Sequence, residues 1–283
     1  MVSELTRIGS LFTGYGGLDM AVQSVLGGEV AWYSEIDKHA CTVLAAHYPG
    51  VPNLGDVTRI DWTTVEPVDV ITGGYPCQPY SKAGNRDGEA DARDMWPHYR
   101  AAIRALRPRL AILENVREHL SLGFANVIGD LAALGYDARW GVVRASDAGA
   151  PHQRPRLFAA ASDSRGERHG RWKDSGVLGD LGPSAEVASR RSSATRSEPV
   201  PGIAGSRYGV ALDRWASIVG RSYPAPIADG RANGAFVEWM MGLPEGHVTG
   251  HGLKPAACLK MLGNGVVPQQ AALALRLLGV GPC

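Results

Sequence analysis

The sequence has few cysteines, almost no net charge and no long hydrophobic run, and each absence excludes a class of protein. Four cysteines occur in 283 residues and none forms a C-x-x-C pair, which argues against zinc sites and thioredoxin-like redox centres. The formal net charge is +1, so any surface for a polyanion must be a local patch. No apolar run approaches membrane-spanning length, and the first residues lack the apolar segment of a signal peptide. We therefore expect a cytoplasmic protein that associates with neither a membrane nor a metal.

What the sequence does contain is a β-branched run that ends in two glycines, over residues 70–78 (VITGGYPCQ). Such a run predicts a buried strand that stops at a turn. Side chains at the carboxyl end of such a strand point into the crevice where open α/β sheets bind ligands. Cys77 is therefore placed as a nucleophile. For a lone cysteine a buried, small apolar role is the commoner one, and the rest of the chain must decide.

Three features in the first 57 residues predict a site for a nucleoside. Glycines within 14–17 follow a short strand and precede a helix, where backbone can approach a ligand closely. Glu35 ends a second predicted strand, at the position where an acid holds ribose hydroxyls. Asp56 ends a third predicted strand over 53–57 and could accept a hydrogen bond from an exocyclic amine. Taken singly, these features also fit a plain corner, a helix cap and a turn.

A second acid and two arginines lie further along. Glu114 ends a continuous apolar run over 110–116, and a carboxyl group at the mouth of a desolvated site tends to hold a proton. Arg154 and Arg156 alternate, so on a strand both face one side, as suits a phosphate or a base carbonyl. A structural ion pair for Glu114 and a solvated edge strand for the arginines are the alternatives. The polar, glycine-rich loop over 80–94 is predicted to act as a lid.

The composition changes between about 162 and 235, where Ser, Gly, Arg and Pro dominate. Residues 151–215 hold eleven Lys or Arg against seven Asp or Glu. Arginine and lysine neutralise phosphates, and loops can reach base edges, so this block is a candidate nucleic-acid surface. A solvated insert is the alternative. Periodicity returns at 236–244, and a Gly-Asn-Gly turn at 263–265 is predicted to enter a last helix over 269–278.

The order of these motifs is specific. Phe-x-Gly-x-Gly-Gly, the strand-end Glu, Gly-Asp-Val, Pro-Cys-Gln, Glu-Asn-Val, Arg-x-Arg and Gly-Asn-x-Val follow one another along the chain. The sequence thereby resembles the cytosine-C5 DNA methyltransferases, which use S-adenosylmethionine. The expected fold is α/β, a doubly wound and mostly parallel Rossmann-like sheet with a smaller irregular target-recognition domain. The expected boundaries are 1–160 plus 258–283 for the catalytic domain and 161–257 for the recognition domain.

The resemblance implies roles for individual residues. Cys77 is the implied nucleophile, and Glu114 meets N3 and the amino group of the target cytosine. Arg156, with Arg154, meets the base O2 and nearby phosphate. The implied cofactor contacts are Phe12, Gly14, Gly16, Gly17, Glu35, Ile36, Asp56, Val57, Pro76, Asn264 and Val266, with Met95 or Trp96 in a looser match. The DNA contacts we expect are Gln78, Ser81, Arg86, Arg165 and Arg168. The sequence departs from the family at His152, which stands where glutamine is usual.

We therefore expect methyl transfer from S-adenosylmethionine to C5 of a flipped-out cytosine in double-stranded DNA, through a covalent Cys77 adduct at C6. We expect a monomer of bacterial or phage origin. The alternatives are the same chemistry on transfer RNA, a DNA-binding relative without turnover, and a thiol hydrolase, for which His152 is the only candidate base near a strand end. The sequence leaves open the recognition site and whether a restriction endonuclease is paired with the protein.

Overall fold

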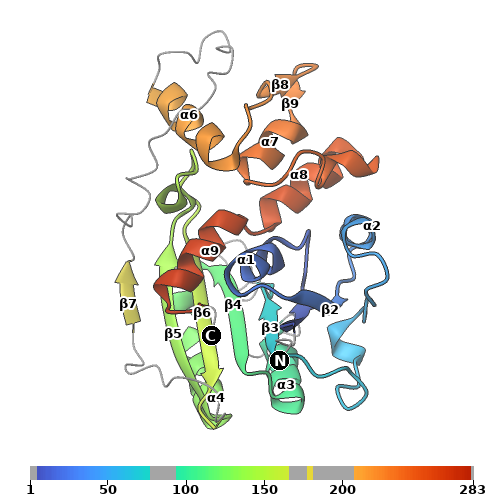
Figure 1. The fold of residues 1–283 in the computed structure, drawn as a ribbon, viewed down its shortest axis with the longest axis vertical. Coiled ribbons are helices and arrows are strands. Elements are labelled where there is room, and N and C mark those ends of the chain that lie inside the picture. Colours follow the sequence, from blue (N-terminus) through green and yellow to red (C-terminus); the bar gives the residue numbers. More distant parts are fainter. Residues whose placement is uncertain (1–4, 77–93, 166–176, 181–206, 282–283) are drawn as a thin grey trace.

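The protein is built on a seven-stranded sheet with helices on both faces (Figure 1). The computed structural model describes residues 5–76, 94–165, 177–180 and 207–281. The strand order is β2-β1-β3-β4-β6-β5-β7. The strands are β1 (Arg7–Leu11), β2 (Glu29–Ser34), β3 (Val70–Gly73), β4 (Leu110–Val116), β5 (Tyr136–Val143), β6 (Arg156–Asp163) and β7 (Val177–Asp180), and a separate pair is β8 (Ile227–Ala228) with β9 (Arg231–Ala232).

Most neighbouring strands are parallel, which confirms the expected fold class. The pairs β1–β2, β1–β3, β3–β4 and β5–β7 are parallel, whereas β6 runs antiparallel to both β4 and β5. The first residue of β6 therefore lies at the same sheet edge as the carboxyl ends of β1, β3 and β4. This reversal brings Arg156 opposite Val116, beside the end of β4.

The continuous apolar runs of the central strands are explained by helices on both faces. Val70 and Ile112 pack with α1 and α9 on one face, and Ile71 and Leu113 pack with α3 and α4 on the other. Alternate residues of a strand point to opposite faces, so a strand covered on both sides must be apolar throughout. The helices are α1 (Gly17–Leu26), α2 (Lys38–His47), α3 (Trp96–Leu106), α4 (Phe124–Ala133), α6 (Arg207–Val219), α7 (Gly234–Met240), α8 (Pro255–Asn264) and α9 (Pro268–Leu277), with 3₁₀ helices η1 (Val57–Arg59), η3 (Arg117–Ser121), η4 (Ala145–Ala148) and η5 (Thr249–His251).

Helices α6, α7 and α8 lie beyond the sheet edge at which the parallel strands end (Figure 1). They pack around Trp215 and Trp239, both fully buried, and Trp215 Nε1 donates to the carbonyl of Trp239 at 2.9 Å. The same core includes Tyr15 and Val43 from the amino-terminal segment. The sequence analysis had not anticipated α6, because it lies in a region whose composition is polar overall.

Two local expectations were wrong. Residues 53–57 are not a strand: Asn53 forms a single bridge with Tyr33, and Asp56 caps η1 by accepting from the amide of Thr58 at 3.0 Å. A short polar side chain that satisfies the backbone locally favours such a turn over a ladder. Asn264 does not enter the last helix but ends α8, and Pro268 starts α9.

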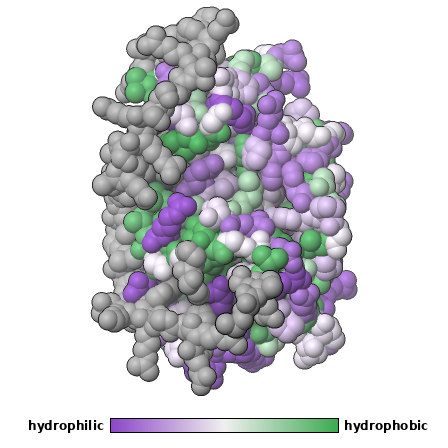
Figure 2. All heavy atoms as spheres, in the orientation of Figure 1, coloured by the Kyte–Doolittle hydropathy of each residue, from purple (hydrophilic) through white to green (hydrophobic). Residues whose placement is uncertain are grey.

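The face drawn in Figure 2 is neither mainly hydrophobic nor free of hydrophobic residues in its described part. Hydrophilic residues are spread over most of the coloured part of that face, with small groups of hydrophobic residues between them. In the four described ranges, no helix combines the length and apolarity that a bilayer crossing requires. The pocket at the sheet edge is the candidate functional site.

Candidate functional site

A pocket of about 490 Å³ lies at the carboxyl ends of β1, β2, β3 and β4. The chain leaves β1 to form β2 on one side and later returns to form β3 on the other, so the pocket lies at the point where the strand order reverses. Open α/β sheets bind ligands at such switch points. Most of the predicted site residues line this one pocket: Phe12, Gly14, Gly17, Glu35, Ile36, Asp56, Val57, Pro76, Glu114, Arg156, Asn264 and Val266.

Glu35 is held by backbone amides at one end of the pocket. Its Oε2 accepts from the amide of Gly14 at 2.8 Å, and its Oε1 accepts from the amides of Ile36 and Asp37, each at 2.8 Å. A carboxylate has about four acceptor positions, so capacity remains for hydroxyl donors from a ligand. In these contacts Glu35 is therefore held as a hydrogen-bond acceptor by backbone amides and not by a side-chain cation.

The glycine turn between β1 and α1 has a backbone that few residues adopt. Phe12 has φ of 53°, which is an outlier for a bulky residue, and its amide donates to the carbonyl of Ser34 at 3.0 Å. Gly16, the N-cap of α1, has φ of 82°. A Cβ on Gly17 would lie 2.3 Å from the carbonyl oxygen of Val266. This strained turn lines the pocket. Backbone outliers of this kind cluster at functional sites.

Apolar surface is available beside the amide-held acid. Ile36 lines the pocket yet is 73% exposed, and Val57 is buried next to Asp56. Large exposed apolar side chains in a pocket are surfaces that a ligand can cover. Of the two looser cofactor candidates, Met95 lines the pocket, whereas Trp96 donates its Nε1 to Asp130 at 2.8 Å.

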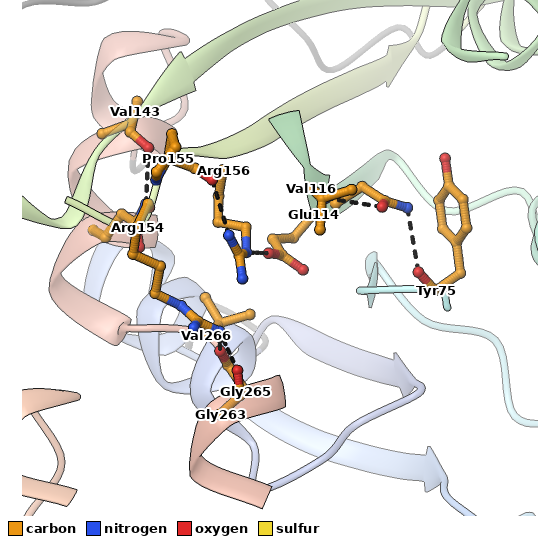
Figure 3. Close-up of polar contacts among 12 residues, drawn as sticks. Tyr75, Glu114, Val116, Val143, Arg154, Pro155, Arg156, Gly263, Gly265 and Val266 are labelled. Atoms are coloured by element: carbon orange, nitrogen blue, oxygen red, sulfur yellow. Dashed lines mark hydrogen bonds and ion pairs between the residues drawn. The ribbon is translucent and has the colours of Figure 1, made fainter. Parts of the chain in front are cut away.

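At the other end of the pocket Glu114 forms an ion pair with Arg156 (Figure 3). Arg156 Nε lies 3.1 Å from Glu114 Oε1, and Glu114 is 9% exposed. Burial raises the pKa of Glu114, while the positive charges of Arg156 and Arg154 oppose that rise. A Cβ on Gly74 would lie 2.8 Å from Glu114 Oε2, so the chain leaving β3 passes against the carboxylate. Glu114 can therefore act as a buried proton donor that a cation orients.

Arg154 does not share a strand face with Arg156, and that expectation was wrong. Arg154 precedes β6 and has φ of 37°, which interrupts the alternation that a strand would impose. Its Nη2 donates to the carbonyls of Gly263 and Gly265 at 2.9 Å and 2.6 Å (Figure 3). His152 Nε2 lies 3.1 Å from the carbonyl oxygen of Met240, a structural contact away from the carboxylate.

A buried polar chain fixes the start of the loop that leads to Cys77. Asn115 Nδ2 donates to the carbonyl of Tyr75 at 3.2 Å, and Tyr75 Oη lies 2.6 Å from His119 Nε2. His119 Nδ1 lies 2.7 Å from the carbonyl oxygen of Leu122, so Nδ1 carries the proton and Nε2 accepts from the tyrosine hydroxyl. Burial lowers the pKa of His119, which favours this neutral form. The backbone two residues before Cys77 is thus held against β4.

Several predicted residues fall outside the described part of the chain. They are Cys77, Gln78, Ser81, Arg86 and Arg168, together with the predicted lid over 80–94 except for its last residue.

Arg165, by contrast, is described and lies away from the pocket. Asp163 donates its amide to the carbonyl of Arg109, at the sheet edge where β4 begins, and Arg165 forms an ion pair with Asp163. Seven residues of β6 separate that edge from Arg156, or about 20 Å. Arg165 Nη2 also donates to the carbonyl of Leu134 at 3.0 Å. The strand therefore carries Arg165 to the sheet edge opposite the pocket, and its contact with DNA stays a prediction.

The sequence analysis missed Asp19, which is 1% exposed and lines the pocket. Its Oδ2 accepts from Ser10 Oγ at 2.8 Å and its Oδ1 from Thr72 Oγ1 at 2.5 Å, which joins β1, β3 and α1. Burial raises the pKa of Asp19 to about 6. The signal was an acid on the apolar face of a helix, directly after the glycine turn. In the part of the chain that the structure covers, no three His, Cys, Asp or Glu side chains are grouped to hold a metal.

A sheet of this topology, with a polar and apolar pocket at its switch point, defines the class of Rossmann-like α/β proteins. Residues 6–177 match the family model of the C-5 cytosine-specific DNA methylase. The match covers more than half of the chain, so the chain belongs to the family of C-5 cytosine-specific DNA methylases.

Individual relatives are similar to this chain over 160 to 166 residues. The Type II methyltransferase M1.ScrFI of Lactococcus lactis subsp. cremoris is 30% identical over 160 residues, which is 55% of this chain and 41% of that protein. The Type II methyltransferase M.NgoMIV of Neisseria gonorrhoeae is 31% identical over 166 residues, which is 57% of this chain and 53% of that protein. The chain therefore spans about half the length of the curated relatives it matches.

Solved structures share the fold of nearly the whole chain. The methyltransferase EhMeth of Entamoeba histolytica superposes with a TM-score of 0.68, covering 98% of each chain at 16% identity. The Dnmt2 methyltransferase of S. pombe superposes with a TM-score of 0.66, covering 97% of this chain and 98% of that one, also at 16% identity. At this identity the likeness establishes the fold alone.

Proposed function

We propose that the chain is an S-adenosylmethionine-dependent DNA cytosine-5 methyltransferase. The observation that carries this proposal is one pocket whose two ends hold carboxylates in different environments. Glu35, held by backbone amides, lies at one end, and the buried pair of Glu114 with Arg156 lies at the other. One pocket can therefore serve a cofactor and a base together, as a group transfer between two bound molecules requires.

The residues of the cofactor end fit S-adenosylmethionine. Glu35 has acceptor capacity for ribose hydroxyls, and Phe12, Ile36 and Val57 offer apolar surface for a base ring. The glycine turn lets backbone approach the ligand closely. When bound, the cofactor supplies an electrophilic methyl group bonded to a sulfonium.

The proposed chemistry divides between two side chains. The Cys77 thiolate adds to C6 of the cytosine, and Glu114 donates a proton at N3, so C5 becomes enamine-like and nucleophilic. After C5 has gained the methyl group, a water molecule takes the C5 proton as the C6–S bond breaks and releases the thiolate, and N3 returns its proton to Glu114. The geometry supports the role of Glu114, because burial raises its pKa and Arg156 fixes its Oε1. The base must leave the helical stack to enter the pocket.

The test is to incubate the purified chain with unmethylated duplex DNA and S-adenosylmethionine, digest the DNA to nucleosides and measure 5-methylcytosine. We expect the product with the wild type and none with Cys77→Ser, which retains cofactor binding. Product formation by Cys77→Ser at the wild-type rate would remove Cys77 from the mechanism.

A parallel incubation with transfer RNA separates the two substrate classes. Methylation of transfer RNA in the absence of DNA methylation would replace the DNA proposal by the RNA alternative. No product on either substrate, with intact cofactor binding, would favour the relative without turnover. A bacterial or phage source and a paired restriction endonuclease are proposals that rest only on the names of relatives such as the Type II methyltransferases.

A further inference from the structure

Arg154 is tied to the carboxyl-terminal segment by both its side chain and its backbone. Its Nη2 donates to the carbonyls of Gly263 and Gly265, which flank Asn264. Its own carbonyl accepts from Gln270 Nε2 at 2.8 Å, and the same nitrogen donates to the carbonyl of Val143, also at 2.8 Å. Figure 3 shows the guanidinium directed at this loop, whereas Arg156 is directed at Glu114.

The loop that Arg154 holds forms one wall of the cofactor end of the pocket. Asn264 and Val266 both line the pocket, and the carbonyl of Val266 accepts from Tyr15 Oη at 2.7 Å. Gly265 lies so close to Tyr15 that a Cβ there would be 1.8 Å from the ring. The loop is therefore held between Tyr15 of the glycine turn and the guanidinium of Arg154.

Arg154 commits two of its five donor hydrogens to this loop and is not among the residues that line the pocket, whereas Arg156 is. A guanidinium nitrogen that donates to two carbonyls has committed both of its hydrogens. Backbone carbonyls held by a charged donor form stronger hydrogen bonds than neutral pairs do. The segment 154–156 thus divides its two arginines between the two ends of the pocket: Arg156 holds Glu114, and Arg154 holds the wall beside the cofactor.

We propose that Arg154 is a positioning residue for the cofactor: it holds the loop 263–266 closed on the pocket and contacts neither the target base nor a phosphate. This inference rests on the proposed function only for the identity of the cofactor. It makes affinity for S-adenosylmethionine depend on Arg154 even when no nucleic acid is present.

The experiment measures binding of S-adenosylmethionine by calorimetry without nucleic acid, for the wild type and Arg154→Met. Methionine keeps an aliphatic stem of similar bulk and removes every donor. We expect roughly tenfold weaker binding in Arg154→Met, the consequence of losing charged hydrogen bonds, and partial recovery in Arg154→Lys. The matched control is Arg100→Met, which removes an exposed ion pair between Arg100 of α3 and Asp130 of α4 and should leave the affinity unchanged.

Steady-state kinetics give the second measurement. We expect the KM for S-adenosylmethionine to rise in Arg154→Met, while the KM for DNA and kcat at saturating cofactor stay close to those of the wild type. A lower kcat or a higher KM for DNA, with unchanged cofactor affinity, would overturn the proposal and indicate that Arg154 contacts the target base. A merely structural role would lower the thermal midpoint without this split between cofactor and DNA.

Two outcomes separate this inference from the proposed function. If the wild type does not bind S-adenosylmethionine, the cofactor assignment fails and the role of Arg154 fails with it. If the wild type binds and Arg154→Met binds equally well, the role of Arg154 alone is overturned. Should Arg154→Met fail to fold, Arg154→Gln decides in the same way, because its amide is too short to reach both carbonyls.

Discussion

The two ends of the pocket hold their carboxylates by opposite means. Glu35 is partly exposed and receives three backbone amides, from Gly14, Ile36 and Asp37. Glu114 is buried and its described partner is a side-chain cation, Arg156. Amides at fixed positions suit a carboxylate that only accepts hydrogen bonds. A desolvated carboxyl group beside one cation can exchange a proton, because burial favours its neutral form.

Under the proposed function, the contrast teaches how one fold separates cofactor binding from chemistry. The cofactor end is organised by backbone, so its geometry survives many changes of side chain. The base end depends on a few buried side chains whose loss leaves charges unmatched. Substitutions at the base end should therefore abolish turnover and leave cofactor binding intact. Substitutions at the cofactor end should weaken cofactor binding and leave turnover at saturating cofactor intact.

The largest effect is expected at the base end, in Glu114→Gln. The amide has nearly the same shape but cannot give a proton to N3, so methyl transfer should fall by about 10²–10⁴-fold, the usual contribution of a general acid. Binding of S-adenosylmethionine should stay at the wild-type level by calorimetry. Turnover within a few-fold of the wild type would show that Glu114 is not the proton donor and would end the contrast between the two carboxylates.

An intermediate effect is expected at Asp19, which lies between the two ends of the pocket. It accepts hydrogen bonds from Ser10 of β1 and Thr72 of β3. Its pKa is raised from an ordinary 3.8 to about 6 by burial, so the folded state binds a proton more tightly than the unfolded state. The resulting stability is present below about pH 4 and is lost as pH rises through about 6. Asparagine does not titrate, so the free energy of unfolding of the wild type relative to Asp19→Asn should fall by about 3 kcal/mol across that range.

Urea unfolding of both proteins at a series of pH values measures this difference. A difference that stays constant between about pH 4 and pH 7 would mean that Asp19 keeps an ordinary pKa in the folded protein. An Asp19→Asn variant that is less stable by the same amount at every pH would report only the altered hydrogen bonds to Ser10 and Thr72.

The smallest effect is expected at the cofactor end, in Glu35→Ala. Removing the acceptor should weaken binding of S-adenosylmethionine by about 1–3 kcal/mol, the cost of leaving polar groups unmatched. Turnover at saturating cofactor should recover. Glu29→Ala is the matched control, because Glu29 is an exposed acid at the other end of β2 that pairs with Arg7. Equal affinities for wild type and Glu35→Ala would contradict the ribose assignment.

Most of the sheet could be predicted because buried strands carry their own signal. The runs at 70–73 and 110–116 are apolar at every position, since helices cover both faces, and the structure confirms both strands. Helix α3 ends at Leu106, shortly before Pro108, because proline cannot continue a helix. Helix α6 was missed because the block around it is polar in overall composition, and its buried residues Leu212 and Trp215 become a core only against α7 and α8.

Sequence order by itself determined the family resemblance, the strand ends and the residue types of the site, because local motifs encode turns and chemistry. Only the tertiary structure decided which of those residues meet. The reversal of β6 brings Arg156 to Glu114 and carries Arg165 to the far edge, and the positive φ of Arg154 turns its side chain to the loop 263–265. These outcomes depend on strand direction and on contacts more than 100 residues apart in sequence, such as Arg154 with Gly265. A local pattern carries no information about such distant partners, so the different partners of Arg154 and Arg156 appear only in three dimensions.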